Sequence, residues 1–484
     1  MGESVLVPMK GLCMLRFGLP KAVIASFAFL IMRVIEKSLI FITSPIYTRM
    51  LSQDEYGQVS VFLSWQSMLG IVAMFCLSYG VFNNGMIDYE QDRDVYSFSM
   101  LILSNVITLV CGIILFLTYP YIQPVLGIDI PLLSLMFFIF LTQPAFNFWM
   151  SRQRFEYKYK AMSVIVIMSA ILSSVSAIAL IQYWPGHGVY ARLFGGFSIF
   201  IIVYCFFYVY IAFKAKWHLN INYWKGALLF NLPLIPHYLS GHILNNSNRI
   251  IIASLVGNAA AAKYSLAYTI GLAVTIVWSS INSSLIPYTY EKCRNRDFVS
   301  LASTTNAIVL LYSIACGILI LFAPEMLMIM APSSYAECVY IIPPIVGGVF
   351  FMSMYFIFAN VIYYYKRPKY VMYASVTSAV LNIWLNYILI PQYGYFAAGY
   401  TTLACFILQS VLDYYAMRKV TGISIYNMRF LLMLGICVLC VSLLSSFLYY
   451  NDFMRYALIA ALCIALCIFR KKVMSVILKL RVSR

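Results

Sequence analysis

The sequence predicts an all-α polytopic membrane protein with about fourteen membrane-spanning helices. Of its 484 residues, 63% are hydrophobic and only 10% are charged, a balance that soluble domains do not have. The mean hydropathy is +0.86. Apolar stretches of the roughly 20 residues that cross a bilayer recur along the whole chain, and only short connections separate them.

Each predicted span is an apolar run bounded by polar or charged residues. Prolines within several runs require neighbouring helices to satisfy the carbonyl groups that they leave free. The spans begin, in chain order, near Ala22, Gln58, Tyr96, Pro131, Ala161, Gly188, Leu228, Lys263, Leu301, Tyr340, Val371, Phe396, Phe430 and Met454.

The order of the spans suggests an internal duplication, because the seventh span is unusually polar, as the first one is. Transporters are often built from such repeats, with the substrate site between them. We therefore predict an N-terminal lobe of helices 1–6 in residues 1–212 and a basic cytoplasmic linker in 213–227. A C-terminal lobe of helices 7–12 would occupy 228–417, and helices 13–14 with a basic tail would occupy 418–484.

The net charge of +17 is spread over short basic clusters between the apolar runs. This pattern orients membrane helices, because Lys and Arg remain on the cytoplasmic side. We therefore expect both termini in the cytoplasm and no nucleic-acid partner. The clusters fall on alternate connections: Arg152, Arg154, Lys158 and Lys160; Lys214, Lys216 and Lys225; Lys292, Arg294 and Arg296; Lys366, Arg367 and Lys369; Arg418, Lys419 and Arg429.

The first span, from Ala22 to about Ile46, carries Arg33, Glu36 and Lys37 at its centre. A charge in the middle of a membrane helix costs about 2.5–3.5 kcal/mol, so these side chains need partners or water. Helical spacing places them on one face, which we predict to line a solvated cavity. The alternative is an internal Glu36–Lys37 pair that only packs against a neighbouring helix.

The seventh span, Phe230 to Gly257, has a second polar face. His237, Gly241, Asn245, Asn248 and Arg249 fall on one arc of this helix. Two prolines near its cytoplasmic end predict a bend or break there. The alternative role for its asparagines is hydrogen bonding between helices, as polar residues often do in bilayers. The prolines are Pro233 and Pro236.

Together these faces predict a cavity with excess positive charge, from Arg33, Lys37 and Arg249 against Glu36. Arg and Lys are suited to phosphate, so we expect an anionic substrate, in particular a diphosphate. Glu36 has two open roles: exchange of a proton or Na⁺ that couples transport to a gradient, or a permanent salt bridge that orients Arg33. The predicted substrate-binding residues are Arg33, Lys37, Arg249, Asn245, Asn248 and His237.

Other chemistries find no support in the sequence. Asp54 and Glu55 lie in a short turn, where Ser52 or Asp54 capping the second helix is the ordinary account. The histidines lack metal-ligand spacing, there is no phosphate-binding glycine loop, and the cysteines lie in apolar runs. We expect no enzyme activity, no cofactor and no metal.

Two segments resemble a known family. PIYTRMLSQDEYGQ (Pro45 to Gln58) is similar to the helix 1–helix 2 signature of the bacterial polysaccharide exporter family. That family includes the O-antigen (Wzx-type) flippases and, more distantly, the lipid II flippases and the multidrug and toxin extruders. LPLIPHYLSGHILNNSNRIIIASLVGNAAAAKYSLAY (Leu232 to Tyr268) looks like the start of its second lobe.

The resemblance implies a V-shaped pair of helical bundles around a cationic cavity in the bacterial inner membrane. Such a protein would flip undecaprenyl-diphosphate-linked oligosaccharide repeat units by alternating access, for O-antigen of lipopolysaccharide or another surface polysaccharide. Membrane lipids and other polysaccharide assembly proteins are the implied partners. Arg33, Lys37 and Arg249 match positions of cavity cations in the family, whereas Asn248 stands where relatives often have Asp.

Two other function classes agree less well with the sequence. A polymerase, ligase or glycosyltransferase of the same pathway generally needs a large periplasmic loop with catalytic side chains, which this chain lacks. A multidrug or small-molecule cation antiporter of the same fold would be expected to have an acidic cavity, whereas the predicted cavity is basic.

Overall fold

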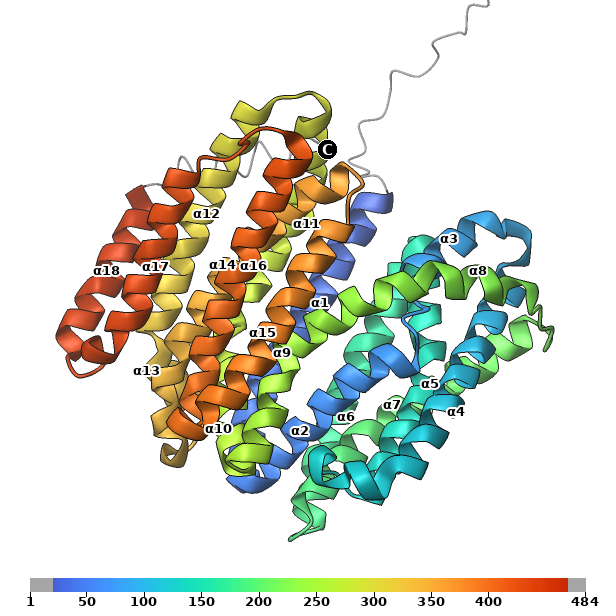
Figure 1. The fold of residues 1–484 in the computed structure, drawn as a ribbon. Coiled ribbons are helices and arrows are strands. Elements are labelled where there is room, and N and C mark those ends of the chain that lie inside the picture. Colours follow the sequence, from blue (N-terminus) through green and yellow to red (C-terminus); the bar gives the residue numbers. More distant parts are fainter. Residues whose placement is uncertain (1–20, 469–484) are drawn as a thin grey trace, which may run out of the picture.

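The structure is a computed structural model that describes residues 21–468, and throughout this range its regular structure is helical (Figure 1). Short 3₁₀ segments, η1 to η4, connect several helices. The α-helices are α1 (Lys21–Met50), α2 (Gln53–Ala73), α3 (Gly80–Asp88), α4 (Arg93–Leu126), α5 (Ile130–Phe155), α6 (Tyr159–Tyr183), α7 (Gly188–Lys214), α8 (Asn222–Asn231), α9 (Ile235–Leu255), α10 (Asn258–Gly271), α11 (Ala273–Arg294), α12 (Phe298–Leu321), α13 (Ala323–Met330), α14 (Ile342–Tyr364), α15 (Lys369–Tyr393), α16 (Ala397–Thr421), α17 (Met428–Leu448) and α18 (Asp452–Ile468).

The predicted all-helical class is confirmed. Each predicted span begins in one of these helices or in the 3₁₀ segment directly before it. Within residues 21–468, nine helical segments are long and apolar enough to cross a membrane, and one of them, Lys369–Thr421, contains both α15 and α16. The count of about fourteen crossings stays a prediction.

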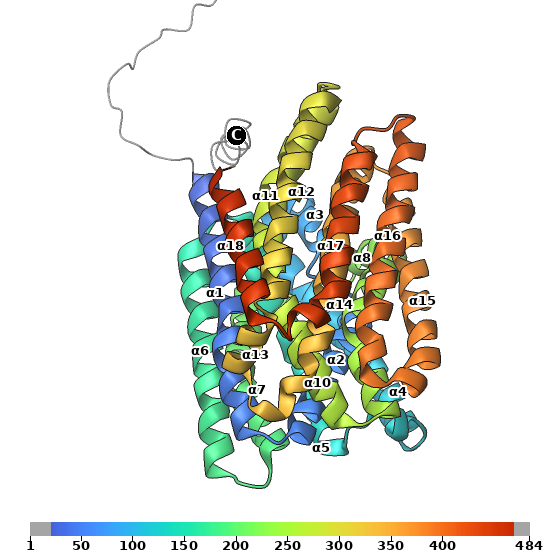
Figure 2. The same ribbon diagram turned by 90° about the vertical axis from the view of Figure 1, so that its left-hand side faces the viewer.

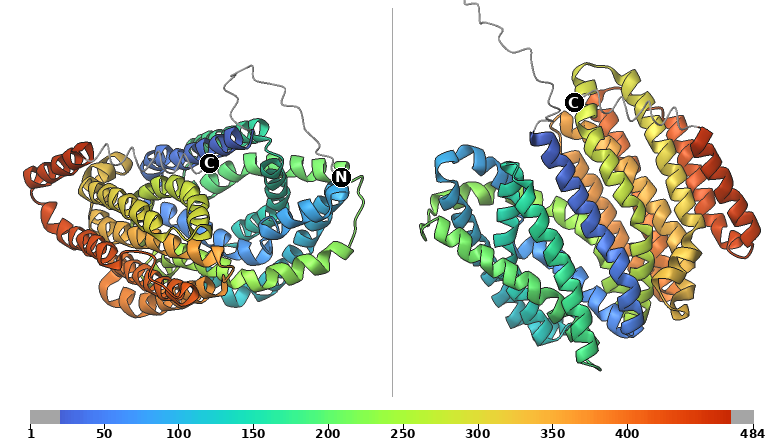
Figure 3. Two further views of the ribbon diagram at one scale, coloured as in Figure 1. Left: turned by 90° about the horizontal axis from the view of Figure 1, so that it is seen from above. Right: turned by 180° about the vertical axis from the view of Figure 1, so that it is seen from behind.

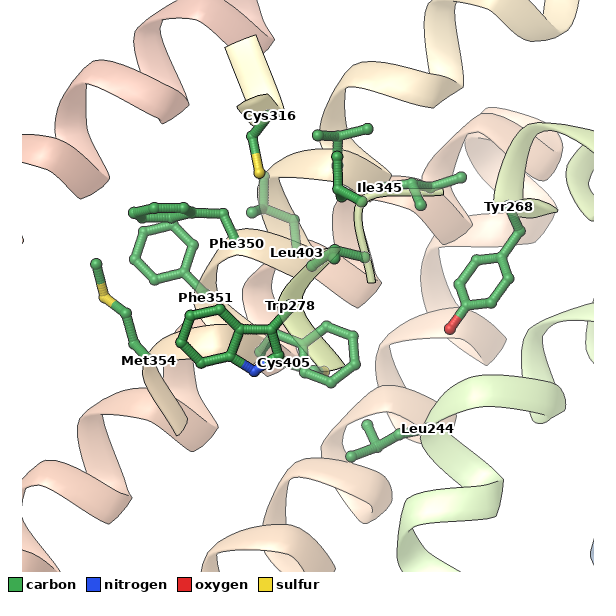
Figure 4. Packing of buried hydrophobic residues seen from close by; sticks show 14 of the residues in the cluster. Leu244, Tyr268, Trp278, Cys316, Ile345, Phe350, Phe351, Met354, Leu403 and Cys405 are labelled. Atoms are coloured by element: carbon green, nitrogen blue, oxygen red, sulfur yellow. The ribbon is translucent and has the colours of Figure 1, made fainter. Parts of the chain in front are cut away.

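The helices form two bundles, each with its own hydrophobic core (Figures 1 and 2). The first core extends from Met32 to Ala227 and is centred on aromatic residues such as Phe82 and Phe148. The second core lies in α9 to α17, and Figure 4 shows Trp278, Phe350 and their neighbours packed within it. The residue boundaries of the lobes given above stay a prediction.

The bundles converge where α2 packs against α9 and α10, and they diverge toward the end at which α1 begins (Figures 1 and 3). Helix α1 lies between them, in contact with α6 on one side and with α11 and α13 on the other. At the convergence, Gly57 of α2 meets the backbone of α10: a Cβ on Gly57 would lie 1.9 Å from the carbonyl oxygen of Asn258. This close approach requires glycine.

The predicted break in the seventh span is confirmed. Helix α8 ends at Asn231, η2 (Leu232–Leu234) follows, and α9 begins at Ile235, so Pro233 falls in the break and Pro236 in the first turn of α9. Proline removes a backbone donor and its ring clashes with the preceding turn, which interrupts the helix here. Non-helical backbone at membrane depth is tolerated where it lines a cavity or is buried in protein.

Helices α17 and α18 pack on the outside of the second bundle, mainly against α12 and α14 (Figure 2). Two sets of polar contacts connect one end of this helix pair to the second bundle. The Tyr449 hydroxyl donates to the carbonyl oxygen of Ile320 at 2.7 Å. Arg455, only 3% exposed, forms ion pairs with Glu325 and Asp452.

Candidate transport cavity

A cavity of about 480 Å³ lies between α2 and α5, and we call it the α2–α5 cavity. Arg33 of α1 lines it, so the predicted exposure of this cation to a chamber agrees with its position. The remaining wall is rich in amides and hydroxyls. These polar lining residues are Gln66, Ser67, Gln143, Asn147, Ser151 and His242.

One wall of this cavity is a polar stripe on α5. Gln143, Asn147, Met150 and Arg154 are spaced by four, three and four residues, so they share one helix face. The sequence reading missed this stripe, because Arg154 was counted with the basic connection and the two amides lie in an apolar run. The helical spacing of the amides and Arg154 was the available signal.

Arg33 and Arg154 are two guanidinium groups that line the same cavity. Arg154 lies within electrostatic range of the charges on Arg33 and Glu36. Neither arginine forms an ion pair with any residue whose side chain the structure describes. The neighbouring Arg152, by contrast, is paired with Asp94 and Glu156. The cavity therefore has two cations whose donors are free for an anion.

A second cavity of about 360 Å³ lies between α9 and α14, and we call it the α9–α14 cavity. The predicted residues His237 and Asn245 line it. Ser67 and His242 line both cavities, and Ser67 Oγ lies 2.7 Å from His242 Nδ1. This pair, one residue from each bundle, is the point at which the two cavities meet.

Arg249 lies one helical turn beyond Asn245 and lines neither cavity. Its guanidinium donates to the carbonyl oxygen of Asn245 at 3.0 Å and to Asn246 Oδ1 at 3.2 Å. It also lies over the Tyr268 ring, 4.8 Å from the centroid. All these partners are neutral, so none of them supplies a counter-charge to the Arg249 guanidinium.

Asn248 is only 1% exposed and lies in a network between helices. Its Nδ2 donates to the Tyr264 hydroxyl and to Thr402 Oγ1, each at 2.6 Å. Its Oδ1 accepts from Asn386 Nδ2 at 2.7 Å, and Asn386 in turn accepts from Thr401. The network connects α9 to α10, α15 and α16, and a substrate contact by Asn248 stays a prediction.

Glu36 and Lys37 are exposed on α1, but neither lines the two cavities. No ion pair joins Glu36 to Arg33 or to Lys37, although the structure describes all three side chains. The geometry therefore gives no support to an internal Glu36–Lys37 pair or to a salt bridge that orients Arg33. Substrate binding by Lys37 and ion exchange at Glu36 stay predictions.

The turn between α1 and α2 and the residues beside it contact both bundles at the converging end. Ser52 caps α2 in a capping box with Glu55, which confirms the capping role expected for this turn. Glu55 also accepts from the Gly188 amide of α7 at 3.0 Å. Toward the second bundle, Thr48 donates to the carbonyl oxygen of Met330 and Gln53 to that of Ser334, each at 2.7 Å.

A family model described as polysaccharide biosynthesis protein matches residues 25–292, which include both polar faces and the α1–α2 turn. The chain belongs to this family. The family model named MatE matches residues 233–388 within the second bundle. A curated protein from the Lsg locus of Haemophilus influenzae is 22% identical to this chain over 360 residues. The match covers 71% of this chain and 85% of that relative.

Solved structures confirm the fold of the chain. The lipid II flippase MurJ in an inward closed conformation gives a TM-score of 0.66 at 12% identity, covering 93% of this chain and all of that one. An inward-facing multidrug resistance MATE family transporter of the MOP superfamily gives 0.61 at 13% identity, covering 82% and 98%. The chain therefore has the fold of membrane flippases and transporters, and the predicted polysaccharide exporter resemblance is confirmed.

Proposed function

We propose that the protein is a flippase that translocates undecaprenyl-diphosphate-linked oligosaccharide repeat units across the bacterial inner membrane by alternating access. The translocated repeat units would be used to build O-antigen or another surface polysaccharide. The observation that supports this most directly is the pair of arginines, Arg33 and Arg154, in a polar cavity at the boundary of the two bundles. Neither has an acidic partner among the described side chains.

In this proposal the diphosphate binds the guanidinium groups. Each guanidinium presents a planar set of N–H donors that matches phosphate oxygens, and the low dielectric of a membrane cavity strengthens the attraction. Lys37 and Arg249 add positive charge on either side of the path. The diphosphate would thus bind cations at the boundary between the bundles, where both bundles can contact it.

The sugars would bind the neutral polar walls. Gln143 and Asn147 offer amides on the α5 side, while His237 and Asn245 offer polar groups on the α9 side. Sugar hydroxyls both donate and accept hydrogen bonds, so amide and imidazole groups suit them. The undecaprenyl chain would remain in the hydrocarbon of the bilayer.

Alternating access follows from the arrangement of the bundles. In the described conformation the α1–α2 turn joins both bundles at the converging end, while the bundles diverge at the other end. With both termini in the cytoplasm, the open end faces the cytoplasm, where the repeat unit is assembled. Release would require the contacts of the turn to break.

A small-molecule antiporter is the second candidate, favoured by the likeness to a MATE family transporter. Cationic drugs are bound best by cavities with acidic residues, whereas the α2–α5 cavity is lined by two arginines and no carboxylate. The electrostatics therefore favour the anionic lipid-linked substrate.

The test is depletion of the protein in its native cell, with the location of lipid-linked repeat units as the readout. We expect these units to accumulate on the cytoplasmic face and to be cleared by the wild-type chain. The double variant Arg33→Ala/Arg154→Ala, expressed to the same level, should not clear them. Arg294→Ala, an exposed arginine at the end of α11, is the matched control that should. Clearance by the double variant would refute the proposed substrate site.

A further inference from the structure

Asp413 of α16 is a buried carboxylate without a partner. Its exposed fraction is 0%, and neither of its side-chain oxygens has a hydrogen-bond partner. No Lys, Arg or His among the described residues pairs with it. An isolated carboxylate anion is very costly in such a place, so the group is neutral and holds a proton in this conformation.

The groups around Asp413 lead to the α9–α14 cavity. Helix α14 packs against α16, and the titratable groups of α14 nearest to Asp413 are Tyr355 and Tyr363. From α9, His237 Nε2 lies 3.5 Å from the Tyr363 hydroxyl. Both His237 and Tyr355 line the cavity.

The remaining neighbours are neutral amides and hydroxyls. Gln409, one turn before Asp413 on α16, lines the same cavity and donates to Ser375 Oγ of α15 at 3.1 Å. Gln409 Oε1 and His237 Nδ1 both lack a hydrogen-bond partner. Polar atoms that could accept or pass on a proton or a water molecule therefore extend from the cavity to the helix turn that carries Asp413.

We propose that Asp413 is a proton-exchange site of the second bundle. It binds a proton in the described conformation and releases it to water in the α9–α14 cavity, by way of Tyr363 and His237, when the bundles rearrange. A tyrosine hydroxyl and a neutral imidazole each accept one proton while giving up another, so the path moves one proton without net change in its own groups. Helix α9 starts at the proline break, so its movement would change the distance between His237 and Tyr363.

A purely structural role makes a different prediction. If Asp413 only fills space as a neutral side chain, the isosteric amide of Asp413→Asn should reproduce all properties of the wild type. If Asp413 is a proton-exchange site, the Asp413→Asn variant should keep the wild-type fold but should no longer respond to a change in proton concentration. The inference concerns a site separate from the substrate cations and is testable without any substrate.

The first experiment is infrared spectroscopy of the purified full chain in vesicles of phosphatidylethanolamine and phosphatidylglycerol. We expect a C=O band of a protonated carboxyl group at neutral pH that is absent in Asp413→Asn and retained in Glu36→Gln. In D₂O this band should shift, and the shift should be several-fold slower in Tyr363→Phe. A band that is unchanged in Asp413→Asn would overturn the site, and an unchanged exchange rate in Tyr363→Phe would overturn the path.

The second experiment measures flipping of a fluorescent undecaprenyl-diphosphate-linked saccharide in the same vesicles. An imposed proton gradient should accelerate the wild type and leave Asp413→Asn unaffected, while downhill flipping persists in both. Equal acceleration of both proteins would refute the proposal. If neither flips the lipid while the infrared band behaves as expected, the proposed substrate is wrong and the proton site stands.

Discussion

The Cα of Gly57 lies against the carbonyl group of Asn258 so closely that an added Cβ would be 1.9 Å from the oxygen. This contact between α2 and α10 joins the bundles at their converging end. A backbone carbonyl cannot turn away as a flexible side chain can, so any larger residue must separate the two helices.

Gly57→Ala should therefore destabilise the described conformation. Overpacking at tight contacts costs about 1–3 kcal/mol. We expect a lower midpoint of thermal unfolding in detergent and more rapid cysteine labelling at the α1–α2 turn. Gly226→Ala on α8 is the control, because nothing lies within 4 Å of an added Cβ there. Equal behaviour of the two variants would show that the contact is not tight in the membrane.

Arg154→Gln should weaken binding of a soluble undecaprenyl-diphosphate analogue as strongly as Arg33→Gln does. Loss of a charge-assisted contact predicts a Kd about 10- to 100-fold higher, or about 1.4–2.8 kcal/mol. Arg154→Lys should restore part of the affinity, because it keeps the charge but not the planar donors. Binding measured by calorimetry checks this, and an unchanged Kd in Arg154→Gln would remove the residue from the site.

Asn248→Ala should lower stability more than it lowers flipping rate per folded molecule. The substitution removes one hydrogen-bond partner from each of Tyr264, Thr402 and Asn386 and leaves an N–H of Asn386 unpaired, which costs about 1–3 kcal/mol. Thermal unfolding of the purified protein is the measurement. Asn295→Ala, an exposed position after α11, should change nothing.

Acidification should weaken the contacts of Glu156, which lies between α5 and α6. Partial burial acts to raise the pKa of this carboxyl, but hydrogen bonds from Lys158 and Arg152 prevail and hold the pKa below its usual value. A lowered folded-state pKa means stability that is present at pH above the unfolded pKa and lost as pH falls through the folded one. Glu156→Gln should reduce the loss of thermal stability between neutral and acidic pH, and an identical loss would contradict the assignment.

The sequence predicted those features that depend on local order. Apolar runs locate the helices, Pro233 and Pro236 predict a break, and Ser52 or Asp54 predicts a helix cap, because each depends on nearby residues alone. Arg33 lines the α2–α5 cavity, whereas Glu36 and Lys37, which the helical spacing placed on the same face, line neither cavity.

The rest depends on which helices are neighbours. Periodicity shows that Asn245 and Asn248 share an arc, but only tertiary packing places the first in a cavity and the second in a buried network. Arg154 was missed for a related reason. Its position at the end of a span looked like a topology signal, and only tertiary packing places it on the wall of the cavity that Arg33 also lines.

The contact between Ser67 and His242 has a consequence for the length of saccharide that fits. Ser67 and His242 line both chambers, which have volumes of about 480 and 360 Å³. Under the proposed function, a short glycan would occupy one chamber and leave this pair in contact, while a longer one would separate the pair and occupy both. Under that proposal, tolerance for repeat units of different size depends on how easily this serine and this histidine separate.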